Sequence, residues 1–401
     1  DPPQASGSVD QGLHRLAQVH ATGQRATTRW KRTAKCAKKT EEKLSDRNYS
    51  IAVIRGDGIG IEVVEEGLKV LRAVDDRAAL CLEFTEFSWG SDCYLEHGAM
   101  MPADALETLA GFDAIFLGAV GHPEIHDHVT LNELLLPIRR RFDQYVCLRP
   151  NTLFSGMDSP LKKAKPGEID ITLVRENTEG EYANVGGIQF ENQSSEMGVQ
   201  AGVFTRHGCE RVIRYAFELA RSRGSKKPVT SITKSNAQGY GMVVWDRAFE
   251  RVSAEYPELS TQSLLVDAAA MEFVRRPESF DVVVASNLFG DILSDLAAII
   301  TGSIGLAASG NINPEGDHPS MFEPVHGSAP DIVGKGLANP LAAILSAAMM
   351  LEHLGQAAAA AAIRKAVLSV VEQGAALPPD MGGTANTTQV GDAVVNALEP
   401  A

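Results

Sequence analysis

Cysteine, long apolar runs and basic charge are all scarce in this chain. Its five cysteines form no CxxC pair, which indicates reduced thiols in a reducing compartment and predicts a cytoplasmic location. No apolar run reaches about 18 residues without a charge or a helix breaker, so we expect no membrane span. The formal net charge of −14 argues against a nucleic-acid surface, although local basic clusters remain compatible with a small anionic substrate.

What the chain does contain is typical of a globular protein. Hydrophobic residues make up 44% and charged residues 22% of 401 positions, which suits two domains or one large domain with a second lobe. Strand-like and helix-like segments alternate, so the sequence predicts an α/β fold. Residues 1–48 are basic and lack both apolar periodicity and the apolar core of a secretory signal. We expect a disordered tail there, with a targeting segment or an anion-binding arm as the alternative.

Residues 286–296 (SNLFGDILSDL) carry the clearest chemical signal. They follow the β-branched run DVVVA at 281–285, which predicts a buried strand. Asp291 and Asp295 stand four residues apart, so on a helix both carboxylates lie on one face, about one turn apart. Like charges at this spacing repel, and a hard divalent cation such as Mg²⁺ or Mn²⁺ would relieve that repulsion. Two solvated surface aspartates are the alternative.

Charged residues also follow several other predicted elements. Arg139, Arg149 and Arg175 come at the ends of separate elements, where guanidinium groups are suited to bind carboxylates unless they pair with local acids. Lys234 follows the predicted strand 229–233 and is either a base, if partly desolvated, or an ordinary solvated lysine. Asp267 opens the predicted helix 268–275, where a plain N-cap role is the simplest explanation.

A glycine-rich turn, RGDGIG at 55–60, joins the predicted strand 50–54 to a predicted amphipathic helix at 62–74. The glycine spacing is not GxGxxG, so we do not expect a standard Rossmann site. A turn beside a ligand and a tight turn without one are both compatible with this segment.

Taken in order, the motifs IRGDGIG, LRP, VRENTEGEY, TKSN, VDAAAM, NLFGDILSDL and EPVHGSAPDI resemble those of the decarboxylating β-hydroxyacid dehydrogenases, the isocitrate/isopropylmalate dehydrogenase family. The resemblance covers roughly residues 49–398. It implies a two-lobed, isopropylmalate dehydrogenase-like α/β fold that is not a Rossmann domain. The larger lobe would comprise 49–144 and 303–401, and the smaller lobe, with the dimer interface and the metal ligands, 145–302.

The resemblance also assigns roles to individual residues. Asp291 and Asp295 match two metal ligands, and Asp267 matches a third that the partner subunit supplies, which implies a homodimer with a shared active site. The substrate's carboxylates would be held by Arg139, Arg149 and Arg175. Tyr182 matches the acid that protonates the enolate carbon, and Lys234 matches the base that helps remove the hydroxyl proton.

For the cofactor, the resemblance points to the EPVHGSAPDI loop. His326 and Asn339 match positions near the adenine, Gly327 lies in the same loop, and Asp331 matches a position that faces the adenosine ribose. An aspartate there would repel a 2′-phosphate, so we expect NAD rather than NADP. The ions implied are Mg²⁺ or Mn²⁺, with K⁺ as a further candidate.

Substrate choice is expected to depend on residues 131–138 (LNELLLPI), where Glu133 and Leu135 would not favour the third carboxylate of isocitrate. The motifs FDQYV and RYAFELARSR resemble the branch that acts on tartrate or D-malate. In contrast, GLAASGNINP resembles some 3-isopropylmalate dehydrogenases. We therefore expect a small 2-hydroxy diacid, tartrate or D-malate, as substrate, with 3-isopropylmalate as the alternative. A non-catalytic regulatory subunit is the hypothesis from another class.

Overall fold

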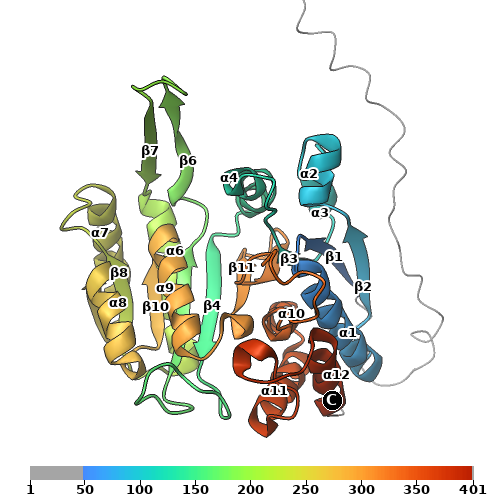
Figure 1. Ribbon diagram of the computed structural model, residues 1–401. Coiled ribbons are helices and arrows are strands. Elements are labelled where there is room, and N and C mark those ends of the chain that lie inside the picture. Colours follow the sequence, from blue (N-terminus) through green and yellow to red (C-terminus); the bar gives the residue numbers. More distant parts are fainter. Residues whose placement is uncertain (1–47, 400–401) are drawn as a thin grey trace, which may run out of the picture.

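The computed structural model describes residues 48–399 (Figure 1). The predicted tail, residues 1–48, lies outside the described residues except for its last position and stays a prediction. Within the described range, no helix is both long enough and apolar enough to cross a membrane.

A ten-stranded sheet runs through the described part of the chain, in the order β2-β1-β3-β12-β11-β4-β5-β10-β8-β9. Its strands are β1 (Tyr49–Gly56), β2 (Leu82–Phe87), β3 (Ala114–Ala119), β4 (Val146–Thr152), β5 (Asp170–Glu176), β8 (Val229–Thr233), β9 (Thr261–Leu265), β10 (Val282–Ala285), β11 (Ala308–Ile312) and β12 (Ser320–Pro324).

The sheet is parallel at both ends and antiparallel at its centre. Strands β2, β1, β3 and β12 are parallel neighbours, as are β5, β10, β8 and β9. Between these groups, β11 is antiparallel to both β12 and β4, and β4 is antiparallel to β5. A Rossmann sheet is mostly parallel, so this mixed centre agrees with the prediction that the glycine-rich turn does not belong to one.

Strands β1 and β3 are buried on both faces. In β1, Ile51 and Val53 point into the larger hydrophobic core, whereas Ala52 and Ile54 point into a smaller one on the opposite face. Strands of this kind need apolar side chains at every position rather than at alternate ones. This explains why the runs IAVI at 51–54 and AIFLG at 114–118 are continuously apolar.

Helices cover both halves of the sheet. Helices α1, α10, α11 and α12 pack against one another beside β1, β3 and β12, and α6 to α9 lie on the half that contains β5, β8 and β10 (Figure 1). The α-helices are α1 (Gly60–Ala78), α2 (Ser91–His97), α3 (Ala105–Leu109), α4 (Asp127–Thr130), α5 (Leu136–Arg141), α6 (Arg206–Arg223), α7 (Gly241–Ser253), α8 (Val266–Arg275), α9 (Asn287–Ile300), α10 (Leu341–His353), α11 (Ala357–Gln373) and α12 (Thr387–Ala397). Shorter turns are the π-helical η2 (Leu131–Leu135) and the 3₁₀ turns η3 (Pro277–Ser279), η4 (Ile304–Leu306) and η5 (Pro379–Met381).

A two-stranded hairpin projects from the body of the molecule. It consists of β6 (Gly180–Gln189) and β7 (Met197–Val203) and stands apart from the large sheet (Figure 1). Its apolar side chains include Ile188, Phe190 and Val199, which are more than half exposed.

The glycine-rich turn packs against the end of β3. Gly56 and Gly58 have φ angles of +68° and +56°, which L side chains rarely adopt. A Cβ at Gly60 would lie 2.5 Å from the backbone nitrogen of Ala119. The Asp57 carboxylate accepts hydrogen bonds from the backbone N–H groups of Ser91 and Gly121, both at 2.7 Å. The turn therefore fixes the 118–121 segment, part of which lines the cavity described next.

Candidate active site

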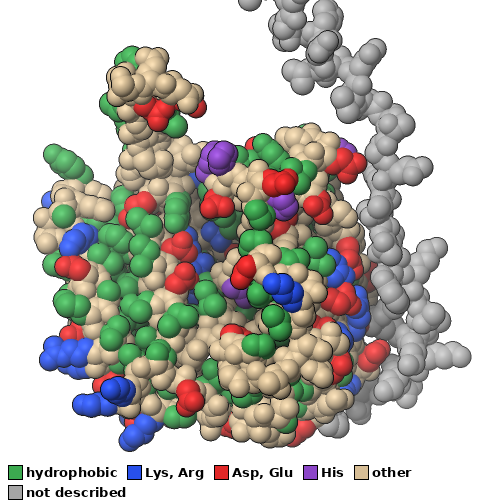
Figure 2. Space-filling model, viewed as in Figure 1, with side chains coloured by type: hydrophobic (Ala, Val, Ile, Leu, Met, Phe, Trp, Pro, Cys, Tyr) green, Lys and Arg blue, Asp and Glu red, His purple; other side chains and the backbone are tan. Residues whose placement is uncertain are grey.

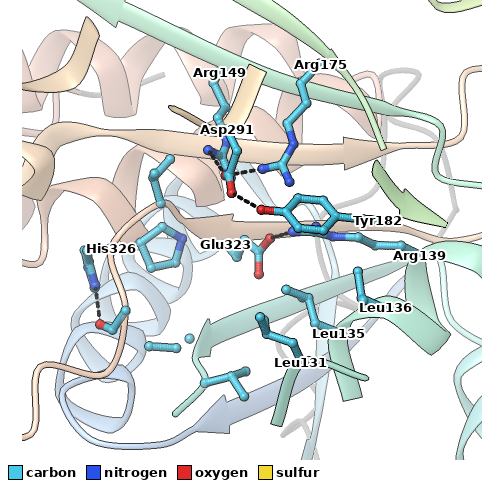
Figure 3. Close-up of a pocket in the computed structure, with 16 residues that line it drawn as sticks. Leu131, Leu135, Leu136, Arg139, Arg149, Arg175, Tyr182, Asp291, Glu323 and His326 are labelled. Atoms are coloured by element: carbon cyan, nitrogen blue, oxygen red, sulfur yellow. Dashed lines mark hydrogen bonds and ion pairs between the residues drawn. The ribbon is translucent and has the colours of Figure 1, made fainter. Parts of the chain in front are cut away.

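A cavity of about 190 Å³ lies between the two halves of the sheet (Figure 3). Its walls come from β3, η2, α5, β4, β5, β6, α9, β12 and the loop after β12. The structure brings together here many of the residues singled out in the sequence: Leu135, Arg139, Arg149, Arg175, Tyr182, Asp291, His326 and Gly327.

The register of the sheet places two of the arginines side by side. Strand β4 pairs with β5 so that Arg149 faces Leu173 and Cys147 faces Arg175. Arg149 and Arg175 are therefore diagonal neighbours on one face of the sheet. Both are almost fully buried. Two adjacent buried cations repel each other, so this arrangement requires a nearby anion.

Asp291 supplies that anion. Its Oδ1 accepts hydrogen bonds from Arg175 Nη1 and, at 3.1 Å, from Arg149 Nη1. Although burial alone would favour the protonated acid, the charges of Arg175 and Arg149 hold the pKa of the Asp291 carboxyl below its ordinary value. The three side chains form one ionised cluster in the cavity wall.

The N-terminal part of α9 holds Arg175 in place. Asn287 Oδ1 accepts hydrogen bonds from Arg175 Nε at 3.0 Å and from Nη2 at 2.7 Å. One turn later, a Cβ at Gly290 would lie only 2.7 Å from Arg175 Cβ. Glycine at 290 therefore lets the helix approach β5 closely enough for Asp291 to reach the guanidinium group.

Arg139 has its own counter-ion. Its Nη2 donates to Glu323 Oε1 at 2.8 Å, and both side chains are buried. Asn311 Nδ2 donates to the same oxygen at 2.8 Å. Ser294 Oγ accepts from Arg149 Nη1 at 2.6 Å. Glu323, Asn287 and Ser294 all lie inside motifs quoted above, but their role in the site depends on tertiary contacts that the spacing of the sequence does not reveal.

Tyr182 points its hydroxyl at the ionised cluster. Tyr182 Oη donates to Asp291 Oδ2 at 3.1 Å, and the Arg175 guanidinium carbon lies 5.5 Å from the centre of the tyrosine ring. Burial and the negative charge of Asp291 raise the pKa of the Tyr182 phenol. The phenol is therefore protonated at neutral pH and has a proton to give.

Asp295 lies one turn beyond Asp291 on α9, as the sequence predicted for a helix. Its side chain is half exposed, and its nearest cation is Arg149, whose Nη1 is 3.9 Å from Asp295 Oδ1. Partial burial and the negative charge of Asp291 raise the pKa of Asp295, and these effects outweigh the opposite effect of the Arg149 charge. Among residues 48–399 of a single chain, no group of three or more His, Cys, Asp and Glu side chains is arranged to hold a metal ion.

Lys234 and Asp267 lie together but away from this cavity. Lys234 Nζ is 2.7 Å from Asp267 Oδ1, and neither residue lines the cavity. The hydrogen bond from Lys234 lowers the pKa of the Asp267 carboxyl. The N-cap role that the sequence favoured for Asp267 is wrong, because α8 begins at Val266 and its N-cap residue is Leu265.

The loop after β12 brings only part of the predicted cofactor set to the cavity. His326 and Gly327 line it, and burial lowers the pKa of His326, which favours the neutral imidazole. His326 Nε2 is buried without a hydrogen-bond partner among the described residues. Asp331 is exposed, and buried Asn339 donates to Asp380 Oδ2 at 2.9 Å, so neither residue is a wall of this cavity.

The wall opposite the arginines is apolar. Leu131, Leu135 and Leu136 line the cavity from the π-helical turn η2 and the start of α5. Figure 3 shows these leucines across the cavity from Arg149 and Arg175. One side of a bound molecule would therefore meet charge and the other would meet hydrocarbon.

Comparison with known proteins identifies the family of this chain. The sequence profile of the isocitrate/isopropylmalate dehydrogenase family matches residues 50–394. The chain belongs to this family. Membership makes the protein an oxidoreductase that acts on a CH–OH group, and it confirms the resemblance drawn from the motifs.

Relatives and solved structures agree with this assignment. The chain is 51% identical over 359 residues to the D-malate dehydrogenase [decarboxylating] of Escherichia coli (strain K12), which covers 88% of this chain and 99% of the relative. It is 50% identical over 359 residues to the tartrate dehydrogenase/decarboxylase of Pseudomonas putida, with 88% and 98% coverage. The structure of isocitrate dehydrogenase from Methylococcus capsulatus superposes with a TM-score of 0.79 at 35% identity, covering 87% of this chain and 99% of that one. The structural likeness confirms the predicted isopropylmalate dehydrogenase-like fold.

The role of Asp291 as an internal counter-ion leads to a prediction. Asp291→Asn removes the carboxylate that competes for Arg149 and Arg175, so without added metal a dicarboxylate should bind more tightly. In a buffer that contains EDTA, we expect Asp291→Asn to bind malonate roughly five- to tenfold more tightly than the parent does, as measured by isothermal titration calorimetry. Asp295→Asn is the matched control, because its carboxylate makes only the 3.9 Å contact. Equal malonate affinities in the parent and Asp291→Asn would contradict the assignment.

Proposed function

We propose that the protein catalyses the NAD-dependent oxidative decarboxylation of a small 2-hydroxy diacid, tartrate or D-malate, together with Mg²⁺ or Mn²⁺. The observation that carries the proposal is the convergence of Arg139, Arg149 and Arg175 on one small cavity that also contains Asp291 and Tyr182. The names of the relatives from E. coli and P. putida support the reaction type and both substrates.

Charge balance supports the joint binding of a diacid and a divalent cation. Three guanidinium groups face the carboxylates of Asp291, Asp295 and Glu323, so the site by itself is close to neutral. A diacid adds two negative charges in a largely buried position, which is unfavourable unless a cation enters with it. A divalent cation restores neutrality, and the hard oxygens of Asp291 and Asp295 are suitable ligands for Mg²⁺ or Mn²⁺.

The metal site requires a second chain in this proposal. Asp291 and Asp295 would hold the ion from α9, and Asp267 of the partner subunit would complete the set. Because Lys234 and Asp267 are hydrogen-bonded within one chain, the partner would deliver both together. A bound divalent cation would polarise the substrate's hydroxyl and stabilise negative charge that develops on the adjacent oxygens.

Exposed apolar side chains support the homodimer. Met271 and Val274 on α8 and Ile292 and Ile299 on α9 are each about half exposed or more, and these two helices contact each other. Figure 2 shows hydrophobic side chains gathered on the face over α8 and α9. An apolar surface of this kind marks an interaction site, and symmetric pairing would let a second copy cover it. The β6–β7 hairpin adds further exposed apolar residues.

Within the cavity, each protein group has a distinct task. Arg149 and Arg175 would transfer their hydrogen bonds from Asp291 to a substrate carboxylate, while Arg139 stays anchored on Glu323. The partner's Lys234 would accept the hydroxyl proton as the hydride leaves the adjacent carbon. After CO₂ departs, the Tyr182 phenol, which is held protonated, would give its proton to the carbon that carried the carboxylate.

For the cofactor we propose NAD, bound along the loop that contains His326 and Gly327. Asp331 is exposed on this loop and is available to accept hydrogen bonds from two ribose hydroxyls. Its charge would repel the 2′-phosphate of NADP. The neutral His326 imidazole, whose Nε2 has no hydrogen-bond partner within residues 48–399, and Asn339 are proposed to lie near the adenine.

The apolar wall bears on the choice of substrate. Leu131, Leu135 and Leu136 offer no cation for a third carboxylate, which disfavours isocitrate because a buried unpaired charge is costly. A leucine wall would also suit an isopropyl group, so 3-isopropylmalate is the second candidate. The small cavity favours the smaller diacids.

Side-by-side turnover assays test the proposed reaction. D-malate, tartrate and 3-isopropylmalate would be compared by kcat/KM with NAD and Mn²⁺, with NADP as the cofactor control. We expect NAD reduction with D-malate or tartrate. A preference of about a hundredfold for 3-isopropylmalate, about 2.7 kcal/mol of transition-state binding, would overturn the substrate assignment. No NADH from any diacid would favour a non-catalytic subunit.

Subunit mixing tests the shared site. Lys234→Ala and Asp291→Asn homodimers should each be nearly inactive, because every site lacks one essential group. After subunit exchange, each mixed dimer should contain one intact site, since Lys234 acts in the partner's site and Asp291 in its own. About a quarter of the parent's activity should return. No recovery, despite heterodimers detected by native mass spectrometry, would contradict the shared site.

A further inference from the structure

Glu176 is a buried acid that the proposed reaction does not use. It is the last residue of β5, directly after Arg175, and is only 2% exposed. No ion pair with Glu176 is found within residues 48–399. Its carboxylate instead accepts hydrogen bonds from the N–H and hydroxyl of Thr178 at 2.8 and 2.9 Å and from Glu179 N–H at 3.0 Å. Burying an acid without a cation is costly, so its presence calls for an explanation.

The carboxylate holds together the turn that links β5 to β6. The two oxygens of Glu176 gather the N–H groups of Thr178 and Glu179 into one tight bend. The bend ends at Gly180, which has a φ angle of +71°. A Cβ at Gly180 would lie 3.2 Å from Asn287 Cβ, so the turn lies directly against the start of α9.

From this turn, hydrogen bonds reach Arg175. The carbonyl oxygen of Glu179 accepts from Asn287 Nδ2 at 3.1 Å. With Nδ2 bound to this carbonyl, the Asn287 amide directs its Oδ1 at Arg175, where the oxygen accepts hydrogen bonds from Nε and Nη2. The turn thus fixes the orientation of the Asn287 amide, and the amide fixes the guanidinium group.

The same turn leads to Tyr182. The Glu181 carboxylate accepts from Ser286 Oγ at 3.1 Å and from the Leu288 N–H at 3.2 Å. An acid at this position also interacts favourably with the N-terminal dipole of α9. Tyr182 is the next residue, so its place beside Asp291 depends on this anchored segment.

We propose that Glu176 is a positioning residue for the reaction, because its carboxylate fixes the 176–181 turn that sets Arg175 and Tyr182 against Asp291. This inference rests on the proposed function for its kinetic readout. Glu176 touches neither the cavity nor its contents and acts only through the turn.

A pH dependence follows from this arrangement. Burial, opposed by the N–H bonds from Thr178 and Glu179, raises the pKa of Glu176 to about 7. Charged or titratable groups around the turn include Glu179, Glu181, His207, Cys209 and Arg211. Protonation removes acceptor capacity from the turn, so activity should fall as the pH falls through about 7. The pKa of Glu176 is higher in the folded than in the unfolded state. Its contribution to the free energy of unfolding therefore decreases as the pH rises from about 4.5 to about 7.

Glu176→Gln tests the proposal, with Glu66→Gln as control. Glu66 is a similarly buried acid on α1, paired with Lys69 and remote from the cavity. At pH 8 we expect Glu176→Gln to lower kcat on D-malate roughly ten- to a hundredfold, with a Tm close to that of the parent, because no buried charge remains. Its pH profile should lose the inflection near 7. Glu66→Gln should keep the parent's kcat and profile.

A merely structural role makes different predictions. The proposal is overturned if Glu176→Gln has a kcat per folded molecule within about twofold of the parent's and an unchanged pH profile.

If Glu176→Gln does not fold, Thr178→Val is the second test, because it removes one hydrogen bond to the Glu176 carboxylate. It should also lower kcat, and an unchanged kcat would overturn the proposal. If the parent turns over no diacid, the proposed function fails, and crystallography of Glu176→Gln still decides: unmoved Arg175 and Tyr182 side chains would refute the positioning role.

Discussion

Two buried guanidinium groups on neighbouring strands must share an anion, and much of the structure around the cavity serves that requirement. Arg149 and Arg175 are diagonal neighbours because β4 and β5 are antiparallel, an arrangement that the mixed centre of the sheet makes possible. Asp291 neutralises them only because α9 can approach β5 closely at Gly290. Removing one member of such a buried cluster costs about 3–5 kcal/mol, because an uncompensated charge is left behind.

The cluster also explains how the site can accept a ligand. In the proposed function, a substrate carboxylate would take the position that Asp291 occupies on the two arginines, so diacid binding would exchange one anion for another. The displaced aspartate would then need a cation, and Asp295 lies on the same helix face to help bind it. Substrate and metal affinities should consequently be coupled, each favouring the other. The apolar wall of Leu131, Leu135 and Leu136 limits which anions fit.

The charged groups of the site were predictable from the sequence, but their pairings were not. The buried strands at 51–54 and 281–285 were predictable because both faces need apolar side chains, and the helical spacing of Asp291 and Asp295 was visible directly. The ordered motifs identified the family. In contrast, the bonds of Arg139 to Glu323 and of Arg175 to Asn287 join residues more than a hundred positions apart, and no local pattern encodes such contacts. The N-cap interpretation of Asp267 failed because the helix starts at Val266, two residues earlier than predicted. The lobe boundaries and the assigned residue roles stay predictions.

A crystal structure of the protein with D-malate and Mn²⁺ would show whether the substrate takes the place of Asp291 on the two arginines. We expect Arg149 and Arg175 to leave Asp291 and bind a malate carboxylate, while Asp291 and Asp295 turn to the ion beside Asp267 of the partner subunit. If both arginines still held Asp291 while malate was bound elsewhere, this exchange would be refuted.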